Sequence, residues 1–560
     1  MRKKPLLFCL SFLGLSLTLA SCTNPFDFGS QNNDGTSANA TSVNPNTSNG
    51  TAASSGTAAT GTSATANTGT TSVATSTGTV NPITGEVPAT VNDDNYNALW
   101  TYGSDIKLSL KFTNTSLYYL SHYTGPESGI STTPYTKYYD FYFPADLTLT
   151  LNGTDYVLKD VGVREKGNNT RTNFCDSSGN ISSSTHTSHL KVCFDATFET
   201  ESASANSNLK SFFTKYSYST SVSERKDRTL FGLGKLDLKY FERNSDLDLS
   251  SGLRYEGVGC YGQEIYCYDA FRKEGIIAPH ANSASLTLST DADTVTTNYE
   301  IIETIDKKML KRYYSRDDSQ GDLYKCTWSR TAGMTSASFA SSSISSPGTG
   351  DIGIEDNVKG YHPTYDLKTN DSAGASSDFS KMSSLITLVN NAANGKVSQS
   401  SLEAGLDVDQ FLKFSAVSAC LGNYDDYRYS YNNYYLYFVP STGKAIYIPY
   451  DYDWSLGSES SSANMATRGA YDETSCQGSG TNANPIFKAT IFKNSGSTSY
   501  SKSGYQKSYS SYISQALSDG ILTSSNYQSL VGSLKNVDHP EYSTVSSYMS
   551  SKTSILKSTI

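Results

Sequence analysis

Two carboxylates stand two residues apart in the stretch 448–457, IPYDYDWSLG. Asp451 and Asp453 follow an apolar run that predicts a buried strand, so both acids lie where that strand ends. Carboxylate oxygens are hard ligands of the kind that Mg²⁺ prefers. The stretch therefore indicates a metal site at the end of a strand.

A second acidic group precedes the first. The segment 421–437, LGNYDDYRYSYNNYYLY, contains Asp425 and Asp426, followed by the adjacent Asn432 and Asn433. Phosphoryl transfer requires a carboxylate that orients and deprotonates a hydroxyl, with an Asn and an Asp that hold Mg²⁺ against nucleotide phosphates. Asp-rich turns also cap or solvate helices, and the same oxygens suit a structural Ca²⁺ site. Both alternatives stand beside the catalytic interpretation.

The elements that must position these acids follow from the hydrophobic pattern. Alternation of apolar and polar residues, with an Asn-Gly turn, predicts strands within 106–112, 145–167, 189–198, 283–290, 433–439 and 444–453. Helical spacing predicts helices within 250–275, 378–395 and 407–423, surface helices within 511–520 and 542–559, and a strand that runs into a helix over 299–316. Residues 330–380 are rich in Ser and Gly and predict a loop insertion. The order indicates an α+β fold of two lobes with a cleft between them.

The N-terminus has the three parts of an export signal. The stretch MRKKPLLFCLSFLGLSLTLASC combines a basic start, a short apolar run and small residues before Cys22. Its end resembles the bacterial lipobox, in which the signal is cleaved and the cysteine carries lipid. We therefore expect residues 1–22 to be a lipoprotein signal peptide and Cys22 the anchor, with an ordinary signal peptide as the alternative.

Composition divides the rest of the chain. Residues 23–95 are almost entirely Ser, Thr, Asn, Gly and Ala, which offers too little apolar surface to offset the entropy of ordering. We interpret them as a tether that holds a folded domain, residues 96–560, away from a membrane. The formal net charge of −9 shows no basic excess, so a nucleic-acid partner is not expected.

Several short motifs, taken in order, resemble the spore-coat CotH kinases, whose fold is an atypical protein-kinase-like one. The motifs are VGVREKGNNT (161–170), HLKVCFD (189–195), LFGLGKLDLKY (230–240), LRYEGVGCYGQEIY (253–266), YEIIETIDKKML (299–310), GDLYK (321–325) and the two acidic stretches. The resemblance covers most of residues 105–460. It implies a two-lobed α+β fold with a β-rich N-terminal lobe and a mostly helical C-terminal lobe.

The resemblance also implies roles for the acids. Asp451 is the first candidate metal ligand, with Asp453 close behind, and Asn433 matches the asparagine ahead of the Tyr-rich strand. Asp425 is the candidate catalytic aspartate, with Asp426 as its rival. The DYRYSY segment between the acids and the asparagines is longer than the usual pattern, so the choice of acid and of asparagine stays open.

By the same resemblance, Lys191 stands where the nucleotide-phosphate lysine is expected, with Lys166 as runner-up. Its acidic partner is expected to be Glu256 or Glu303. Lys166, Gly167 and Asn168 resemble a loop that cradles phosphates, and a plain hairpin turn is the alternative.

The expected protein is an exported, lipid-anchored atypical protein kinase. It would use ATP and Mg²⁺, with Mn²⁺ as an alternative ion, and transfer the γ-phosphoryl group to Ser or Thr of envelope proteins. It would face the periplasm or the exterior of a bacterial cell. The alternative is a non-catalytic envelope scaffold or adhesion protein with a kinase-like fold.

Overall fold

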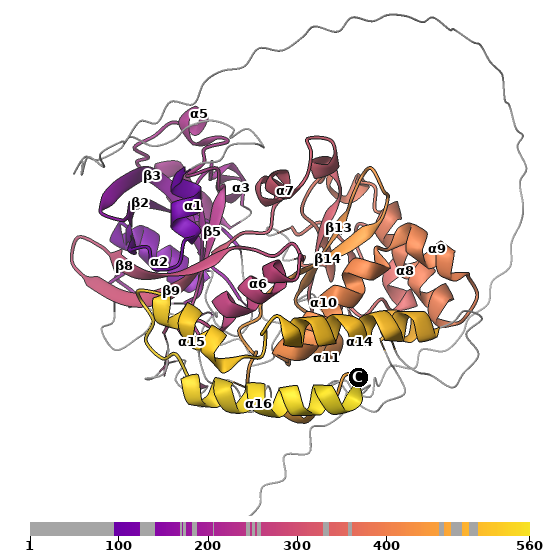
Figure 1. Cartoon of the computed structure of the whole chain (residues 1–560). Coiled ribbons are helices and arrows are strands. Elements are labelled where there is room, and N and C mark those ends of the chain that lie inside the picture. The colour runs from indigo at the N-terminus through magenta and orange to yellow at the C-terminus, as the bar shows by residue number, and fades with distance from the viewer. Residues whose placement is uncertain are drawn as a thin grey trace, which may run out of the picture. The chain divides into compact units, whose positions relative to one another are not determined.

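The computed structural model describes residues 94–123, 140–167, 171, 175–181, 188–204, 206–241, 247–248, 253–254, 259–328, 335–356, 361–457, 464–471, 484–491 and 502–560 (Figure 1). The expected signal peptide, the anchor Cys22 and the tether up to residue 93 lie outside the described residues. Asn168 and Glu256 also lie outside them.

The first half of the described chain forms a closed barrel (Figure 1, indigo to magenta). Its strands, in barrel order, are β1 (Ile106–Lys111), β2 (Phe143–Leu151), β3 (Thr154–Glu165), β4 (Leu190–Cys193), β5 (Lys235–Lys239), β9 (Thr294–Glu303) and β8 (Ala281–Ser289). Every neighbouring pair is antiparallel except β1 with β8. Asn152 and Gly153 both have positive φ in the β2–β3 turn, which matches the twist of the hairpin and confirms the predicted turn.

Helices and one small hairpin accompany the barrel. They are α1 (Asp94–Trp100), α2 (Asn114–Tyr123), α3 (Glu199–Ser202), α4 (Ser207–Lys215), α5 (Val222–Arg225), β6 (Leu247–Asp248) with β7 (Leu253–Arg254), α6 (Gln263–Lys273) and α7 (Lys307–Tyr313). The helix predicted from residue 250 therefore begins only at Gln263. Gly262 precedes it in the left-handed conformation, and residues 253–254 pair with β6 instead.

A second sheet carries both acidic stretches at its strand ends. Its order is β11 (Ile352–Gly353), β12 (Tyr365–Leu367), β10 (Leu323–Cys326), β13 (Tyr434–Phe438) and β14 (Ala445–Pro449). The segment 330–380, for which we expected a loop insertion, also contains β11 and β12, and β12 pairs with β10. Strands of two or three residues are too short to show alternation in a sequence.

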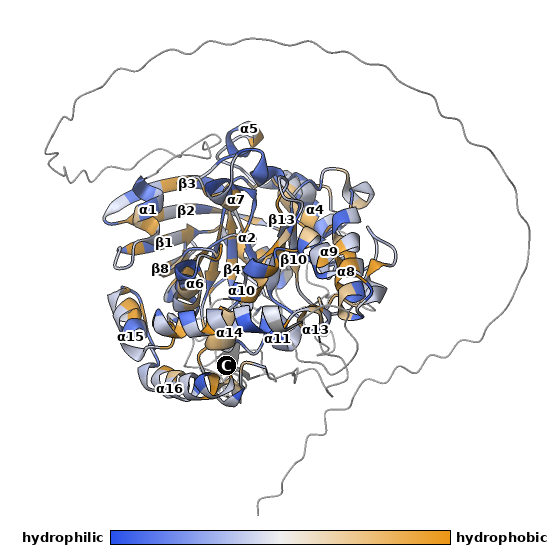
Figure 2. Ribbon diagram, turned by 45° about the vertical axis from the view of Figure 1, so that its right-hand side comes forward, coloured by the Kyte–Doolittle hydropathy of each residue, from blue (hydrophilic) through white to orange (hydrophobic). Residues whose placement is uncertain are grey.

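The second sheet is followed and covered mainly by helices. They are α8 (Ser380–Ala393), α9 (Gln399–Gly405), α10 (Val408–Leu421), α11 (Tyr427–Ser430), α13 (Pro485–Ala489), α14 (Lys502–Ser518), α15 (Ser524–Ser533) and α16 (Tyr542–Thr559), with short 3₁₀ turns at Asp318–Gln320, Ser341–Ile344, Gly374–Ser376 and Asn464–Thr467. Helices α15 and α16 show both hydrophilic and hydrophobic residues, as helices covering a core do (Figure 2). In the part of the chain described here, no helix is both long and apolar enough to cross a bilayer.

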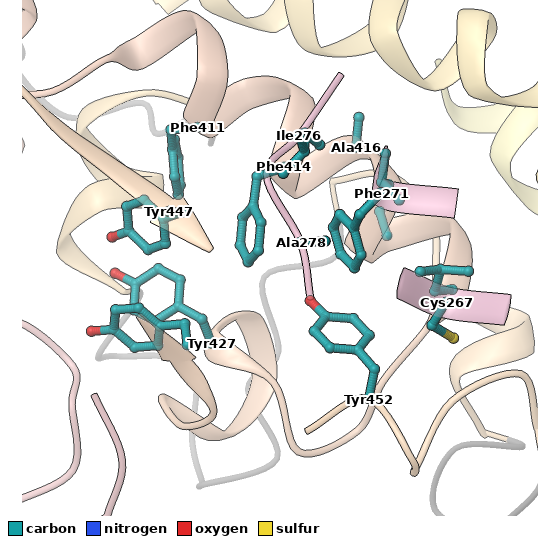
Figure 3. Packing of buried hydrophobic residues seen from close by; sticks show 14 of the residues in the cluster. Cys267, Phe271, Ile276, Ala278, Phe411, Phe414, Ala416, Tyr427, Tyr447 and Tyr452 are labelled. Atoms are coloured by element: carbon teal, nitrogen blue, oxygen red, sulfur yellow. The ribbon is translucent and has the colours of Figure 1, made fainter. Parts of the chain in front are cut away.

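The buried apolar residues form separate clusters. One fills the barrel, and a larger one joins α6, the second sheet and the C-terminal helices. In the larger cluster the rings of Phe271 on α6 and Phe414 on α10 stack at 5.5 Å, and Tyr452 meets Phe271 edge-on at 4.9 Å (Figure 3). The aromatic contacts therefore fix α6 and α10 to the segment that carries Asp451 and Asp453.

Candidate functional site

A cavity of about 230 Å³ brings most of the predicted site residues together. Its lining combines the ends of β3 and β4 in the barrel with β10, β13 and the ends of β12 and β14 in the second sheet. The predicted residues among the lining are Lys166, Gly167, Lys191, Asp425, Asn433 and Asp451. Segments more than 250 residues apart in the chain thus contribute to one pocket.

Asp425 lies on the wall of this cavity with both asparagines. Asn432 donates its side-chain N–H to Asp425 Oδ2 at 3.1 Å, and Asn433 donates to the same oxygen at 3.0 Å. Burial raises the pKa of Asp425 to about 7, and the negative charge of Asp451 adds to the rise. A carboxyl group whose pKa is close to neutral is suited to take a proton from a hydroxyl.

The two asparagines differ in what their amide oxygens do. Asn432 Oδ1 accepts a hydrogen bond from the backbone N–H of Trp328 at 2.9 Å. Asn433 binds Asp425 only through its amide nitrogen, in the contacts of the described residues. Of the two amide oxygens, that of Asn433 is therefore the better placed to coordinate a metal ion.

Asp426, the rival catalytic acid, does not line the cavity. It is 1% exposed and caps α11, because its side chain accepts hydrogen bonds from the backbone N–H groups of Arg428 at 2.9 Å and Tyr429 at 3.3 Å. Ser418 also donates to it. These contacts give Asp426 a structural role at a helix N-terminus.

Asp451 and Asp453 meet at a buried lysine that the sequence analysis did not single out. Lys239, at the end of β5, contacts Asp451 Oδ1, lies 3.3 Å from Asp453 Oδ2 and lies 2.6 Å from Glu264 Oε2 in the first turn of α6. Burial opposes the charged form of Lys239, but the three carboxylates raise its pKa well above the ordinary value. Lys239 is therefore a permanent cation at the centre of this acidic group.

Glu264 also holds the backbone of the acidic segment. Its Oε1 accepts hydrogen bonds from the Tyr268 hydroxyl at 2.7 Å and from the backbone N–H of Tyr452 at 3.1 Å. The Tyr268 hydroxyl accepts one from the N–H of Asp451 at 3.0 Å. Because Tyr452 points into the core, its two neighbours both face Lys239.

Two candidate metal ligands have an uncommon backbone conformation. The φ angles of Asn433 and Asp451 are 57° and 61°, in the left-handed region that non-glycine residues seldom occupy. Such conformations cost about 1–3 kcal/mol each and persist where the surroundings enforce them, often at functional sites. The strain at both positions is consistent with side chains that are aimed at a ligand.

Lys166 and Lys191 line the cavity beside one shared carboxylate, Asp237 on β5. Their ammonium groups lie 3.5 and 3.2 Å from its two oxygens. The expected ion pair between Lys191 and Glu303 is not formed. Glu303 instead contacts Arg312 at 2.8 Å and His280 at 3.1 Å, because β5 lies between β4 and β9 and places Asp237 directly opposite Lys191.

The far wall of the cavity is a network of paired charges. Asp140 contacts Arg171 and lies 3.0 Å from Arg164, while Glu355 lies 2.8 Å from His362 and 3.1 Å from Lys368. Glu355 and His362 come from the segment that was expected to be a loop insertion. The potential ligand atoms of Glu355 and His362 lie within 4.8 Å of that of Asp140. The arginine, lysine and histidine side chains named above compensate the two carboxylates.

The missed pair, Lys239 and Glu264, lies in two motifs that were already recognised. Lys239 ends an apolar strand in LFGLGKLDLKY, and Glu264 opens a helix in LRYEGVGCYGQEIY. In protein kinases a strand lysine and a helix glutamate form an ion pair beside the metal-binding aspartate. A lysine in a strand of buried residues, followed by a helix with an early glutamate, is the signal that could have identified the pair.

Comparison with known proteins decides the family. The family model described as CotH kinase protein matches residues 205–547, which is more than half of the chain. The chain belongs to the CotH kinase family. It is accordingly a kinase-like protein, and ATP and a divalent metal ion are the ligands that such a family uses in general. No curated protein matches this CotH kinase family member.

The donor set of the CotH cavity fits a divalent metal ion. The lining residues Asp451 and Asn433 both offer oxygen donors, as Mg²⁺ requires, and Asp453 meets the same lysine as Asp451 from outside the lining. Although burial opposes ionisation, the Lys239 ammonium lowers the pKa of Asp451, so that carboxyl group is charged at neutral pH. Burial, together with Asp451 and Glu264, raises the pKa of Asp453 to about 7. Asp451 is therefore the better ligand of the two.

The raised pKa of Asp425 leads to a testable effect on stability. A carboxyl group whose pKa is higher in the folded protein contributes stability at low pH, and this contribution is lost as the pH rises through about 7. Asp425→Asn removes the buried charge, so we expect its melting temperature to exceed that of the wild type by several degrees at pH 8. The difference should vanish at pH 4. Calorimetric scans across this range measure it, and an unchanged difference at both pH values would contradict the assigned pKa.

Proposed function

We propose that this CotH kinase family member is an active protein kinase that transfers the γ-phosphoryl group of ATP to hydroxyl groups of Ser or Thr. The observation that carries the proposal is the convergence of Asp425, Asn433 and Asp451 on one cavity that also contains Lys166 and Lys191. Acids and lysines gathered around one cavity, with the pKa of one acid raised to about 7, are typical of functional sites, and this favours the kinase over a scaffold.

The roles follow from position. Asp425 would accept the proton of the acceptor hydroxyl, since its carboxyl group lines the cavity and its pKa is close to 7. Lys166 and Lys191 would hold phosphate oxygens. Lys239, itself held by Glu264, would keep Asp451 in place through direct contact. Asp451 and Asn433 would hold Mg²⁺, which neutralises charge on the phosphates when it is bound.

The architecture supports a two-lobed kinase arrangement. The barrel and the second sheet have separate apolar clusters, and the cavity lies where their strand ends meet. Helix α6, which packs on the cluster of the second sheet, would serve as the glutamate-bearing helix between the lobes, and the acids at the ends of α10 and β14 belong to the second lobe. Nucleotide would bind between the two.

The location proposed for the protein rests on its first 22 residues. A signal peptide that ends in a lipobox would export the chain and attach Cys22 to a membrane. The polar segment after Cys22 would place the kinase away from the lipid surface, where envelope proteins are the available acceptors.

A labelling experiment tests the function. The full chain is incubated with γ-labelled ATP and Mg²⁺, with dephosphorylated casein as the acceptor, and label on protein is measured. We expect the wild type to transfer label and Asp425→Asn to transfer about a hundredfold less, which is the usual contribution of a general base. Because Asp425 does not bind phosphate in this scheme, the variant should keep the thermal stabilisation that Mg²⁺-ATP gives the wild type.

Asp371→Asn is the matched control, because this exposed aspartate lies outside the cavity and should transfer label at the wild-type rate. Equal labelling by the wild type and Asp425→Asn would reject the assigned base. Absence of both transfer and stabilisation by millimolar ATP would favour the non-catalytic scaffold.

A further inference from the structure

Lys325 lines the same cavity and has no role in the chemistry proposed above. It lies in β10, where its cross-strand neighbours are Tyr435 in β13 and Asp366 in β12. Its ammonium group lies 4.8 Å from the centre of the Tyr450 ring, and that of Lys166 lies 5.6 Å from the same centre. The ring of Tyr450, the residue before Asp451, thus has one lysine from the barrel and one lysine from the second sheet close to it.

Lys325 differs from the other cations of the cavity in its partners. Lys166 and Lys191 share Asp237, Arg164 and Arg171 share Asp140, and Lys368 is paired with Glu355 and Asp366. Among the residues that the structure describes, Lys325 forms no ion pair with a carboxylate. Its side chain is partly exposed and lines the cavity, where an anionic ligand could reach it.

The electrostatic surroundings of Lys325 agree with this geometry. Burial lowers its pKa to about 7, and repulsion by Lys191, Lys368 and Lys166 contributes to the decrease. The ammonium form of Lys325 therefore lacks a compensating negative charge. An anionic ligand in the cavity would supply that charge, and a phosphate group has the required charge and oxygen acceptors.

Position decides which phosphate Lys325 would contact. Lys166, Lys191 and Lys239 belong to the barrel, whereas Lys325 belongs to the sheet whose strand β13 begins directly after Asn433. Asp425, the proposed base, is held by that same asparagine. The acceptor hydroxyl and the phosphoryl group that it attacks must meet near Asp425, and Lys325 is paired with Tyr435, two residues after the asparagine that holds Asp425.

We propose that Lys325 binds the terminal phosphoryl group of ATP and stays bound to it during transfer. This inference rests on the proposed kinase function. In the step, the acceptor oxygen forms a bond to the γ-phosphorus as the bond from that phosphorus to the β–γ bridging oxygen breaks. The hydroxyl proton goes to Asp425, and ADP leaves with the bridging oxygen. Lys325 gains and loses no proton and compensates the charge of the transferred group.

Binding of ATP and ADP to the full chain tests the assignment. Affinities are measured by titration calorimetry in the presence of Mg²⁺ for the wild type, Lys325→Met and Lys325→Arg. Loss of one charge-assisted contact should weaken ATP binding by about ten- to a hundredfold in Lys325→Met. ADP lacks the terminal group, so its affinity should change less than about twofold, and Lys325→Arg should retain tight ATP binding.

The control is Lys381→Met, an exposed lysine of α8 that pairs with Asp322 outside the cavity and should bind both nucleotides as the wild type does. Lys325→Met removes an uncompensated cation, so it should melt at or above the wild-type temperature, which confirms that it folds. Equal weakening of ATP and ADP, or no weakening of either, overturns the assignment while leaving the kinase function intact. Failure of the wild type to bind either nucleotide overturns the kinase function and this inference with it.

Discussion

Replacement of Lys239 with methionine is expected to abolish phosphoryl transfer and to lower the free energy of unfolding by about 3–5 kcal/mol. The reason is that Lys239 compensates three carboxylates at once: Glu264, Asp451 and Asp453. Methionine has a similar length but no charge, so it leaves these acids close together in a buried place. Urea unfolding monitored by circular dichroism measures the stability, and the labelling experiment measures transfer.

A second substitution separates the two effects of Lys239. In the double variant Lys239→Met with Glu264→Gln, one uncompensated carboxylate is removed, so part of the lost stability should return while transfer stays absent. Lys107→Met is the control for the loss of a lysine, because its pair with Asp105 lies on the surface and is worth about 1 kcal/mol or less. Full transfer activity in the single variant would contradict the assigned role of Lys239.

Asp451→Asn is expected to reduce phosphoryl transfer about a thousandfold, because a metal ion contributes several kcal/mol to the stabilisation of charge in such reactions. Asparagine keeps the size of the side chain, and the backbone contact from Asn423 to the Asp451 carbonyl at 2.9 Å does not depend on the carboxylate. Lys239 would keep Glu264 and Asp453 as partners, so the variant should fold. Transfer rates measured over a range of Mg²⁺ concentrations test this prediction.

Asp453→Asn is the matched comparison for Asp451. Asp453 does not line the cavity, and its carboxyl group has a raised pKa, so we expect its replacement to reduce transfer far less. If the two variants lost equal activity, or if Asp453→Asn lost more, the first metal ligand would have been assigned to the wrong aspartate.

Much of the fold could be predicted from the sequence wherever an element is long and periodic. Strands β3, β13 and β14, helices α8, α10 and α16, and the Asn-Gly turn all lie within the predicted ranges, and β2 and β8 begin two residues before theirs. The exceptions are short or interrupted elements. Strand β12 has three residues, and α6 begins at residue 263 because Gly262 interrupts the apparent periodicity. Local patterns of this size carry too little information to compete with tertiary contacts.

The candidate site was predictable in its residue types but not in all of its pairings. Both acidic stretches could be read from the chain because each occurs beside a strand, whereas Lys166 and Lys191 were singled out by the resemblance to the CotH kinases. The partner of Lys191 could not be read from the chain, since strand order decides it: β5 separates β4 from β9, so Asp237 and not Glu303 faces that lysine. The contact of Lys239 with Asp451 joins residues 212 positions apart, which no local pattern reveals.

The hydrogen bonds around Tyr268 have a consequence for regulation. The hydroxyl group of Tyr268 joins Glu264 on α6 to the backbone of Asp451, and the stacking of Phe271 with Phe414 holds the same helix against α10. Helix α6 is thus fixed both to the backbone of Asp451 and to α10. If the protein acts as the kinase proposed above, an outward swing of α6 that switched it off would have to break the Tyr268 hydrogen bonds and the stacking of Phe271 on Phe414.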